Sequence, residues 1–406
     1  MKILFVNYSI GGYASDAVQM ITVVKGLKKR GHDITIATTD GDGYFYDKKR
    51  SALYAPIRKK LINGQEKIIE IDGMSIYPIH CNSSKFGMYC FSASKEAKKI
   101  IREFDLIYII NWYYHLGMVF SKIAHEYKVP FIVGPMASLQ AQAHNMKNKQ
   151  KWILDKMYTN KMLKNADGFH CVGHQEKESL LKLGVKPEKI NIIDNGIVLK
   201  NYDTKKTTQI LEKNKIKLNG NPYLLNIGRI DPKKGIDLML LVFSQLNKKY
   251  KNLRLVIVGT GPENYVKEMK ELTKKLGINE SVKFTGYVTE EEKIELLNSA
   301  KLFVVTSHSD VHTTTAIEAM AVGIPVVITK ASDFPEIDSY EAGFTVESTQ
   351  KSIYDAIEEL LEDEEKLKRF SKNAKKLVND RFLLENQIEK YEKMFMEISK
   401  GNNQSD

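Results

Sequence analysis

The sequence predicts an α/β protein built from two doubly wound, parallel-sheet domains in series. Short runs of β-branched and aromatic residues alternate with amphipathic segments of 10–15 residues, a rhythm typical of parallel sheets with helices on both faces. The rhythm stops over residues 199–221, which are polar and lysine-rich and lead into Gly-Asn-Pro at 220–222, and it then starts again. The length of 406 residues also exceeds what one hydrophobic core usually serves. We therefore expect a first domain over 1–200 and a second that begins at 201.

The first domain opens on the apolar run KILFVNY, residues 2–8, which leads through Ser-Ile-Gly-Gly into a helical pattern over 13–31. Asn7 and Ser9 interrupt the apolar character, so we interpret the run as a buried strand that enters a glycine loop rather than as a signal peptide. Later strands are expected over 33–39, 105–110, 130–134 and 168–172, with helical patterns between them. This order is that of a Rossmann-like domain.

The second domain repeats the same order of elements. Strands are expected over 223–229, 253–259, 282–286, 301–307 and 325–329, and helices are expected to start at about 235, 264, 290 and 313. Three further helical patterns follow, over 351–363, 364–379 and 383–399. Because ligands of doubly wound sheets bind beyond the carboxyl ends of the strands, we expect the two domains to face a central cleft.

The composition is that of an ordinary globular protein, with 43% hydrophobic and 27% charged residues. Three widely spaced cysteines without a CxxC pair argue against a disulfide framework or a zinc ribbon, and they favour a reducing, cytoplasmic environment. No run of about 18 apolar residues is present, so no membrane span is expected. The net charge of +11 is uneven, since residues 1–202 hold about 30 Lys and Arg against about 18 Asp and Glu. The first half therefore either meets an anionic partner or presents a solvated lysine-rich surface.

A basic loop follows the first strand of the second domain. In NIGRIDPKKGID, residues 226–237, Gly228 is expected to let the backbone turn sharply, and Arg229 and Lys234 stand at the strand exit and the helix start. A guanidinium and an ammonium at a helix N-terminus suit a diphosphate, the first as a bidentate donor and the second as a point charge. The alternative is a basic loop that binds no ligand.

Two glycine-rich turns are weaker signals of phosphate binding. Gly261 lies in VIVGTGPE, residues 256–263, and Gly12 lies in SIGGYA, residues 9–14. Neither turn completes the GxGxxG dinucleotide fingerprint. Glycine at these positions either serves the turn alone or lets backbone N–H groups approach a phosphate.

The segment SHSDVHTTTAIEAM, residues 307–320, first suggests a metal site. On an extended strand His308, Asp310 and His312 would point to the same side. The sequence offers no fourth ligand nearby, however, and the segment leaves a strand rather than lying within one. We therefore expect no metal here.

A ligand clamp is the other interpretation of the same segment. Asp310 precedes an expected helix start and Glu318 falls about one and a half turns into that helix, so the two carboxylates can hold separate hydroxyl-bearing parts of one ligand. Thr313, Thr314 and Thr315 stand at the helix start, where backbone N–H groups can bind phosphate oxygens.

Taken together, these motifs resemble a known family. GRIDPKKG, IVGTGPE, FTGYV and the Asp310-x7-Glu318 pair followed by AMAVGIPVV stand in the order and spacing of the retaining GT-B glycosyltransferases of family 4. GLKKRGHDITIATT and IIDNGI are similar to features of that family's first domain and domain junction, and the resemblance covers essentially the whole chain. It implies an acceptor-side domain over 1–200, a nucleotide-sugar donor domain over 201–383, and a C-terminal helix, about 384–406, that packs back on the first domain.

The resemblance also implies roles for individual residues. Arg229 and Lys234 would hold the donor diphosphate, Glu318 would bind the donor ribose, and Asp310 would contact hydroxyls of the donor sugar. The implied catalytic residues are thus Arg229, Lys234 and Asp310, and the implied donor-binding residues are Gly12, Gly228, Gly261, His312, Thr313, Thr314, Thr315 and Glu318.

The donor segment departs from the family pattern. Asp310 stands where Glu is usual, and VHT at 311–313 stands where the family usually has a GFG-like sequence, so His312 replaces an aromatic residue and Thr313 a glycine. These changes leave the identity of the donor sugar open.

The acceptor side departs as well. Many members carry a His in the loop after the strand at 130–134, and Met136 stands near that position here. Its role would fall to His115, to His144 or to the donor phosphate itself, and histidine is the side chain whose ordinary pKa suits such a task. We therefore place Met136 and His115 on the acceptor side.

The implied reaction transfers a hexosyl group from a UDP- or GDP-linked sugar to a hydroxyl acceptor, with retention of configuration and without metal or another cofactor. Preorganised positive charge would stabilise the leaving diphosphate, and its β-phosphate oxygen can take the acceptor proton. The family's commonest use predicts a role in bacterial surface polysaccharide assembly, in capsule or lipopolysaccharide, or in glycolipid assembly. The alternatives are a sugar-nucleotide epimerase on the same fold and a non-catalytic donor-binding protein. The sugar, base, acceptor and oligomeric state are not specified by the sequence.

Residues 145–167 bear on the partner of the basic first half. Trp152, Ile153, Met157 and Leu163 alternate there with many lysines, as in an amphipathic helix that lies on anionic lipid. This interpretation predicts a peripheral membrane enzyme with a glycan or lipid-linked acceptor, and its rival is a core-packing helix with a solvated lysine face. Nucleic-acid binding is not expected, because no basic patch is interleaved with aromatic residues in a known module.

Overall fold

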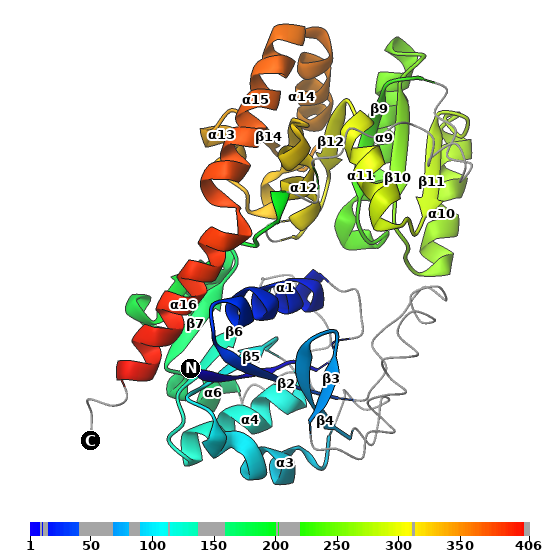
Figure 1. The fold of residues 1–406 in the computed structure, drawn as a ribbon. Coiled ribbons are helices and arrows are strands. Elements are labelled where there is room, and N and C mark those ends of the chain that lie inside the picture. The colour runs from blue at the N-terminus through cyan, green and yellow to red at the C-terminus, as the bar shows by residue number, and fades with distance from the viewer. Residues whose placement is uncertain are drawn as a thin grey trace. The chain divides into compact units, whose positions relative to one another are not determined.

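The computed structural model describes residues 1–8, 10, 15–39, 68–80, 90–112, 114–136, 159–199, 202, 220–310 and 313–401. The chain divides into two compact units, which we call the N-terminal unit (Met1–Asn195 with Leu384–Asp406) and the C-terminal unit (Gly196–Leu383). Each unit holds one largely parallel sheet with helices on both faces, so the predicted fold class is confirmed (Figure 1). The sequence had placed the corresponding boundaries at 200 and 383.

The sheet of the N-terminal unit has eight strands in the order β3-β4-β2-β1-β5-β6-β7-β8. The apolar run at the N-terminus becomes β1, which lies in the middle and pairs in parallel with β2 and β5. The expected strands appear as β1, β2, β5, β6 and β7, and β3, β4 and β8 were not anticipated. The bounds are β1 Lys2–Val6, β2 Asp33–Thr39, β3 Ile69–Ile71, β4 Met74–Ile79, β5 Leu106–Ile110, β6 Phe131–Gly134, β7 Gly168–Cys171 and β8 Ile190–Ile192.

One edge of this sheet is antiparallel, which the sequence analysis missed. β3 and β4 pair in register with Ile71 opposite Met74, so only Asp72 and Gly73 form the turn. Both turn residues have positive φ, 52° and 74°. An Asp-Gly pair with two left-handed residues is the favoured two-residue hairpin connection, since its twist matches that of the strands.

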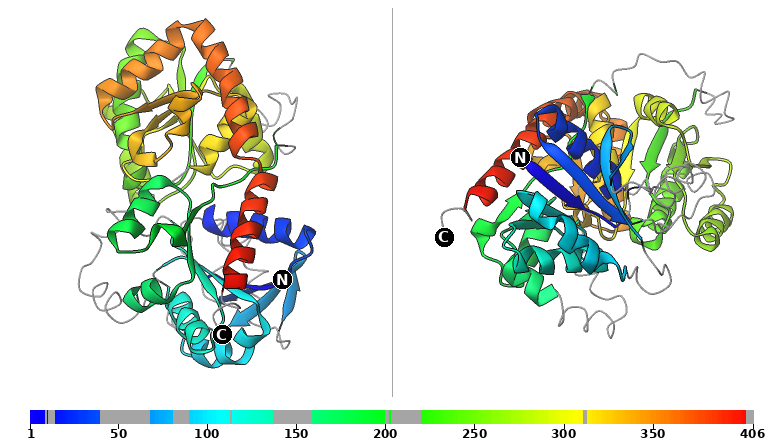
Figure 2. Two further views of the ribbon diagram at one scale, coloured as in Figure 1. Left: turned by 90° about the vertical axis from the view of Figure 1, so that its left-hand side faces the viewer. Right: turned by 60° about the horizontal axis from the view of Figure 1, so that its bottom comes forward.

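Helices cover both faces of the N-terminal sheet. Successive residues of β1 after Lys2 are apolar and point to opposite faces, so both faces must be packed against helices. Ile3 and Phe5 share a core with α1 and α16, while Leu4 and Val6 share another with α3, α4, α6 and α7. Two views of the ribbon show α1 and α16 side by side on one face (Figure 2). The bounds are α1 Ser15–Lys29, α3 Ala93–Ile100, α4 His115–Glu126, α6 Asn160–Asn165, α7 His174–Lys182 and α16 Leu384–Gly401.

A buried histidine ties the C-terminal helix α16 to the N-terminal sheet. His170, on β7, is 1% exposed, with its Nε2 2.9 Å from the carbonyl oxygen of Ile193 and its Nδ1 2.6 Å from the Tyr108 hydroxyl. Since a carbonyl only accepts, Nε2 carries the proton and Nδ1 accepts from Tyr108. Tyr391 of α16 lies 3.3 Å from the same Nε2. Burial lowers the pKa of His170 to about 4, so the ring is neutral in the folded unit.

The sheet of the C-terminal unit has six parallel strands in the order β11-β10-β9-β12-β13-β14. Five of them lie where strands were predicted, and β14 at the edge was not anticipated. The bounds are β9 Tyr223–Ile227, β10 Arg254–Val258, β11 Val282–Gly286, β12 Leu302–Val305, β13 Val326–Thr329 and β14 Gly343–Val346.

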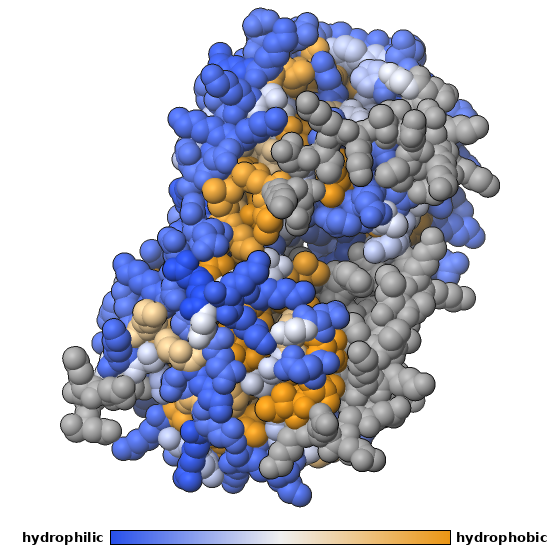
Figure 3. Space-filling view, viewed as in Figure 1, coloured by the Kyte–Doolittle hydropathy of each residue, from blue (hydrophilic) through white to orange (hydrophobic). Residues whose placement is uncertain are grey.

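Helices again occupy both faces of the C-terminal sheet. Leu224 of β9 shares a core with α9, α10 and α14, and Leu225 shares another with α11, α12 and α15. The outer surface over α14 and α15 is largely hydrophilic (Figure 3). The bounds are α9 Ile236–Lys249, α10 Glu263–Lys275, α11 Glu290–Ser299, α12 Thr314–Val322, α13 Glu336–Ser339, α14 Gln350–Glu362 and α15 Glu364–Arg381.

Several predictions fall partly or wholly outside the described residues. Gly12, His144 and His312 are among them, as are residues 145–158 of the expected basic helix and most of the expected linker. The described end of the basic segment, α6, buries Met162 in the core and packs Leu163 against it, as the core-packing alternative expects. Among the helices that the structure describes, none combines the length and the apolar character that crossing a bilayer requires.

Candidate functional site

Three loops pack against one another beyond the carboxyl ends of β9, β10 and β12, where ligands of doubly wound sheets bind. The loops after β9 and β10 touch so closely that side chains are excluded. A Cβ on Gly259 would lie 1.8 Å from the Gly228 carbonyl oxygen, and a Cβ on Gly261 would lie 1.8 Å from that of Ile230. Gly259 also has a φ of 135°, which strongly favours glycine. Glycine at 259 and 261 is therefore required by packing of the protein itself.

Gly228 is different: the backbone bends there, directly after β9, but no neighbouring atom excludes a side chain. Its φ lies outside the left-handed region, and a Cβ there would meet no heavy atom within 4 Å. Neither backbone geometry nor packing within the described structure calls for glycine at this position. The space beside Gly228 would instead admit a close approach by a ligand.

The loop after β12 is hydrogen-bonded to the segment that precedes α9. The backbone N–H of His308 donates to the Lys233 carbonyl at 2.8 Å, and the Thr306 hydroxyl donates to the Gly235 carbonyl at 2.8 Å. Gly235 has a φ of 60°, and a Cβ there would lie 2.1 Å from the Thr306 carbonyl oxygen. These contacts hold Lys234, between Lys233 and Gly235, beside the segment that carries Asp310.

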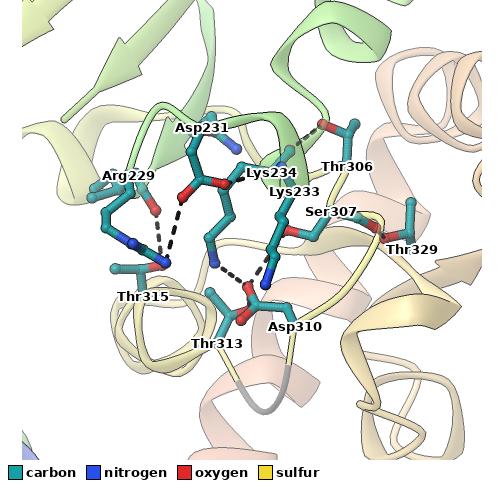
Figure 4. A network of polar contacts seen from close by, with 12 residues as sticks. Arg229, Asp231, Lys233, Lys234, Thr306, Ser307, Asp310, Thr313, Thr315 and Thr329 are labelled. Carbon is teal, nitrogen blue, oxygen red and sulfur yellow. Dashed lines mark hydrogen bonds and ion pairs between the residues drawn. The ribbon is translucent and has the colours of Figure 1, made fainter. Parts of the chain in front are cut away.

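The Asp310 carboxylate is the centre of the resulting polar network (Figure 4). Its Oδ2 lies 2.5 Å from Lys234 Nζ and accepts from the Thr313 hydroxyl at 2.9 Å and from the Ser307 hydroxyl at 3.4 Å. The Lys234 and Asp310 side chains are 20% and 18% exposed, so water screens their attraction only partly. The structure thus brings together two residues that are 76 positions apart in the sequence.

Arg229 reaches the same edge with a freer side chain. Its guanidinium is 60% exposed and lies 3.4 Å from one oxygen of Asp231. The other Asp231 oxygen accepts from the Lys233 N–H at 3.0 Å and so caps the short helix η6, Pro232–Lys234. An exposed guanidinium keeps donors in a fork that matches phosphate geometry.

The threonines expected at a helix start do stand at the start of α12. Thr313 precedes the helix, and its hydroxyl donates to Asp310 rather than capping the first turn. The Thr315 hydroxyl donates to the Ile227 carbonyl at 3.1 Å, which fixes the helix start at the end of β9. Thr314 is the first residue of α12 and is partly exposed. The positive end of the helix dipole therefore lies at the loop edge.

Glu318 lies inside α12 and is buried, at 7% exposure. Its Oε1 accepts from the Tyr202 hydroxyl at 2.8 Å and from Lys293 Nζ at 2.8 Å. Lys293 also lies 2.9 Å from Glu290. Burial raises the pKa of Glu318, while the Lys293 ammonium and the two hydrogen bonds work in the opposite direction.

The sequence analysis missed both partners of Glu318. Tyr202 lies in the expected linker, yet it is buried in the core of the C-terminal unit. A single aromatic residue in a polar, lysine-rich stretch was the available signal. For Lys293 the sequence held no such signal, because its contact with Glu318 depends on how α11 packs against α12.

The alternative metal site finds little support in these contacts. The Asp310 carboxylate faces Lys234, which is a poor neighbour for a cation. Across the described part of the chain, no group of three or more His, Cys, Asp or Glu side chains is arranged to hold a metal ion. His312 lies outside the described residues.

In the N-terminal unit, the acceptor-side candidates lie at the carboxyl ends of β5 and β6. His115 begins α4 and is partly buried, which lowers the pKa of its imidazole, and its Nδ1 accepts from the Cys90 N–H at 3.4 Å. Met136 follows β6 with a φ of 50°, and Asn111 follows the neighbouring β5 with a φ of 72°. Left-handed backbone at non-glycine residues is uncommon and concentrates at ligand-binding edges. Asn111 was not among the predicted residues.

Two known families match successive parts of the chain. Residues 17–201 match the family described as Glycosyltransferase Family 4, and residues 208–377 match Glycosyl transferases group 1. The chain carries the two domains of a GT-B glycosyltransferase.

Relatives of this glycosyltransferase span most of its length. It is 27% identical over 318 residues, 77% of this chain and 67% of the other, to the alpha-monoglucosyldiacylglycerol synthase of Streptococcus pneumoniae. It is 22% identical to an uncharacterized glycosyltransferase of Methanocaldococcus jannaschii, and that match covers 95% of each chain.

Solved structures share the fold of this glycosyltransferase. Anabaena HepE in complex with UDP and glucose superposes with a TM-score of 0.76 at 18% identity, covering 98% of this chain and 100% of that one. WaaG, described as a glycosyltransferase involved in lipopolysaccharide biosynthesis, gives 0.69 at 16% identity, covering 97% and 99%. At these identities the likeness shows the fold alone.

Proposed function

We propose that this glycosyltransferase moves a sugar from a nucleotide-sugar donor to a hydroxyl acceptor with retention of the anomeric configuration. One observation carries the proposal: Lys234 and Arg229 bring two positive charges to the start of α12, at the carboxyl edge of the C-terminal sheet. Such an arrangement suits the negative charge that develops on a departing diphosphate. Anabaena HepE, which has the same fold, has been crystallised with UDP and with UDP-glucose, and this supports a uridine nucleotide as the first donor to test.

In this proposal Lys234 donates hydrogen bonds to the diphosphate, and Asp310 holds the Lys234 ammonium in place. An ammonium has three N–H donors, so one can face Asp310 while the others face phosphate oxygens. Arg229 adds a fork of donors, and the first turn of α12 adds the positive end of its dipole. These groups together would stabilise the diphosphate by donating hydrogen bonds to its oxygens, without a metal ion.

The same arrangement supports the retention that we propose. Asp310 Oδ2 is engaged by Lys234, Thr313 and Ser307, so it is not presented as a nucleophile for a covalent intermediate. The β-phosphate oxygen that leaves the sugar would instead accept the proton of the incoming hydroxyl on the same face. The relative's name describes an alpha-linked product, which is what retention at an alpha-linked donor would give.

The acceptor is proposed to be a glycan or lipid-linked hydroxyl, in surface polysaccharide or glycolipid assembly. The diacylglycerol in the name of the pneumococcal relative supports a lipid, as does the surplus of lysine in residues 1–202. Flotation of the purified protein with liposomes tests membrane contact. Binding that rises with the fraction of anionic lipid and falls with salt is expected. Flotation that is independent of anionic lipid would refute the membrane part of the proposal alone.

Incubation with UDP- and GDP-linked sugars, with and without lipid and glycan acceptors, tests the reaction. Transfer or slow donor hydrolysis is expected, and the proton spectrum of the product's anomeric centre reports retention or inversion. An isomerised donor would identify an epimerase, and binding without turnover would identify a non-catalytic donor-binding protein. Lys351→Met, which removes only an exposed ion pair with Asp355 on α14, is the matched control for Lys234→Met.

A further inference from the structure

We propose that Tyr202 and Lys293 are positioning residues that set the Glu318 carboxylate to bind the ribose hydroxyls of the donor nucleotide. The inference rests on the proposed function, since it assumes that the C-terminal unit binds a nucleotide. It adds two residues from outside the motifs that point to the donor site.

The Glu318 carboxylate is asymmetric in its contacts. Tyr202 and Lys293 both donate to Oε1, at 2.8 Å each, whereas Oε2 is buried without a hydrogen-bond partner among the described residues. A buried carboxylate oxygen that lacks a donor is destabilising, and native structures seldom keep one without a functional reason. Oε2 is therefore the carboxylate oxygen left to accept a hydrogen bond from a ligand hydroxyl.

The two donors come from separate parts of the C-terminal unit. Tyr202 is 9% exposed and belongs to the core that α11 and α12 share. Lys293 lies in the first turns of α11, whose start is fixed by a capping box between Thr289 and Glu292. Two donors on one oxygen, held from two sides, restrict the carboxylate to a narrow range of orientations.

The positive charge of Lys293 also stabilises the ionised form of Glu318. A carboxylate in a buried setting tends to take up a proton, and the protonated form has less capacity to accept from two vicinal hydroxyls. The ammonium of Lys293, shared with Glu290, compensates the charge of Glu318. Tyr202 orients the Glu318 carboxylate, whereas Lys293 both orients it and compensates its charge. Removing either side chain should therefore weaken nucleotide binding, but by different amounts.

The test compares UDP and GDP with their 2′,3′-dideoxy analogues by isothermal titration calorimetry. Wild type is expected to bind one of the natural nucleotides about 10-fold or more tightly than its analogue, because the analogue leaves Glu318 unmatched. Tyr202→Phe and Lys293→Met should weaken binding of the natural nucleotide and leave binding of the analogue nearly unchanged. The ratio of the affinities for the natural nucleotide and its analogue should therefore fall towards one. Lys293→Arg, which keeps the charge, should restore part of this ratio.

Matched controls come from the same unit. Tyr354→Phe removes a Tyr–Glu hydrogen bond of 2.6 Å to Glu358 on α14, and Lys351→Met removes an exposed ion pair. Both should keep the wild-type ratio. A general loss of fold would weaken both ligands equally, and the conservative Tyr202→Phe change keeps the test informative even if Lys293→Met unfolds.

The outcomes separate the inference from the function on which it rests. If wild type discriminates between the ligands and Tyr202→Phe and Lys293→Met discriminate equally well, the inference is wrong and nucleotide binding stands. If wild type binds nucleotide without regard to the hydroxyls, the role of Glu318 is refuted together with the inference. If neither UDP nor GDP binds, the proposed donor class fails as well.

Discussion

Lys234 and Asp310 form an ion pair of 2.5 Å that joins the loop after β9 to the loop after β12. The pair joins the residue proposed to bind the leaving diphosphate to the first acid of the Asp310-x7-Glu318 motif. Both side chains are mostly buried, and Thr313 reinforces the carboxylate. The ammonium is therefore held in place before a ligand arrives, which is the condition for electrostatic catalysis without reorganisation.

Replacing Lys234 should lower turnover strongly. Lys234→Met is expected to reduce kcat by roughly 10²–10³-fold, the range seen when one charge-stabilising donor is removed. Asp310→Asn should also reduce kcat, because it releases the ammonium. Steady-state kinetics with the preferred donor measures both, with Lys351→Met as the control. Near-normal kcat for Lys234→Met would refute the placement of the diphosphate.

Replacing Glu318 should weaken nucleotide binding more than it changes the chemical step. Glu318→Gln keeps the volume but loses the charge, and the loss of a charged hydrogen bond should cost roughly 1.5–3 kcal/mol of binding free energy. Calorimetry with the nucleoside diphosphate measures the effect. Thermal unfolding of the same variant shows whether Lys293, left without the charge of Glu318 and with Glu290 alone as its ion-pair partner, has disturbed the fold. Unchanged nucleotide affinity in a folded variant would place the ribose elsewhere.

Replacing two glycines of the same site by alanine should change different quantities, the free energy of unfolding at 259 and the nucleotide affinity at 228. Gly259→Ala forces a Cβ to within 1.8 Å of the Gly228 carbonyl oxygen at a φ of 135°, so it should destabilise the unit by roughly 3 kcal/mol or more. Gly228→Ala has open space around the new methyl group and should change the free energy of unfolding by less than about 1 kcal/mol. Its effect should appear in nucleotide affinity instead. Urea unfolding and calorimetry separate the two quantities.

Acid should destabilise the N-terminal unit through His170. Burial lowers the pKa of His170 to about 4, whereas an unfolded histidine has a pKa of about 6.5. Between these values the unfolded chain binds a proton that the folded chain does not, so the free energy of unfolding falls as the pH is lowered, by about 3 kcal/mol in total. Above pH 6.5 this contribution is fully present.

His170→Gln provides the control, because its amide can still donate to the Ile193 carbonyl. The variant is expected to be less stable at neutral pH but to lose less stability between pH 6.5 and 4.5. Urea unfolding at several pH values measures both slopes. Equal slopes in the two proteins would show that His170 is not the titrating group.

Metal removal should leave the reaction intact. The two positive side chains and the helix start supply the charge that a metal ion would otherwise provide, so activity after EDTA treatment is expected to match the untreated enzyme. Activity that collapses in EDTA and returns with zinc would restore the site formed by His308, Asp310 and His312 as the better interpretation.

Most of the fold was accessible from the sequence because its elements are strongly periodic. The strand over 33–39 and the helices starting at about 235 and 290 appear with nearly the same bounds in β2, α9 and α11. The hairpin of β3 and β4 was missed although Asp72-Gly73 is a favourable turn pair, because its strands are only three and six residues long. Short strands leave too little alternation to be recognised in sequence.

The residues of the candidate site likewise divide into those that lie in local sequence patterns and those that are brought together only by tertiary packing. Lys234, Asp310 and Glu318 could be predicted as site residues because they stand at fixed spacings within motifs of contiguous sequence. Tyr202 and Lys293 were missed because their relation to Glu318 spans 116 and 25 positions and exists only after α11 and α12 have packed. Gly228 was assigned to a turn from the sequence, and only the structure shows the open space beside its α-carbon.

The C-terminal unit begins and ends at one place. Ile197 forms a parallel bridge with Leu383, and its N–H donates to the Phe382 carbonyl at 2.9 Å. A segment whose two ends are neighbours is an insertion that can be transplanted as a single cassette, with the host chain rejoined at the same point. Residues 196–383 are therefore a natural unit for building chimaeras between members of this family. Exchanging them would be expected to carry donor preference from one enzyme to another while the acceptor stays that of the host.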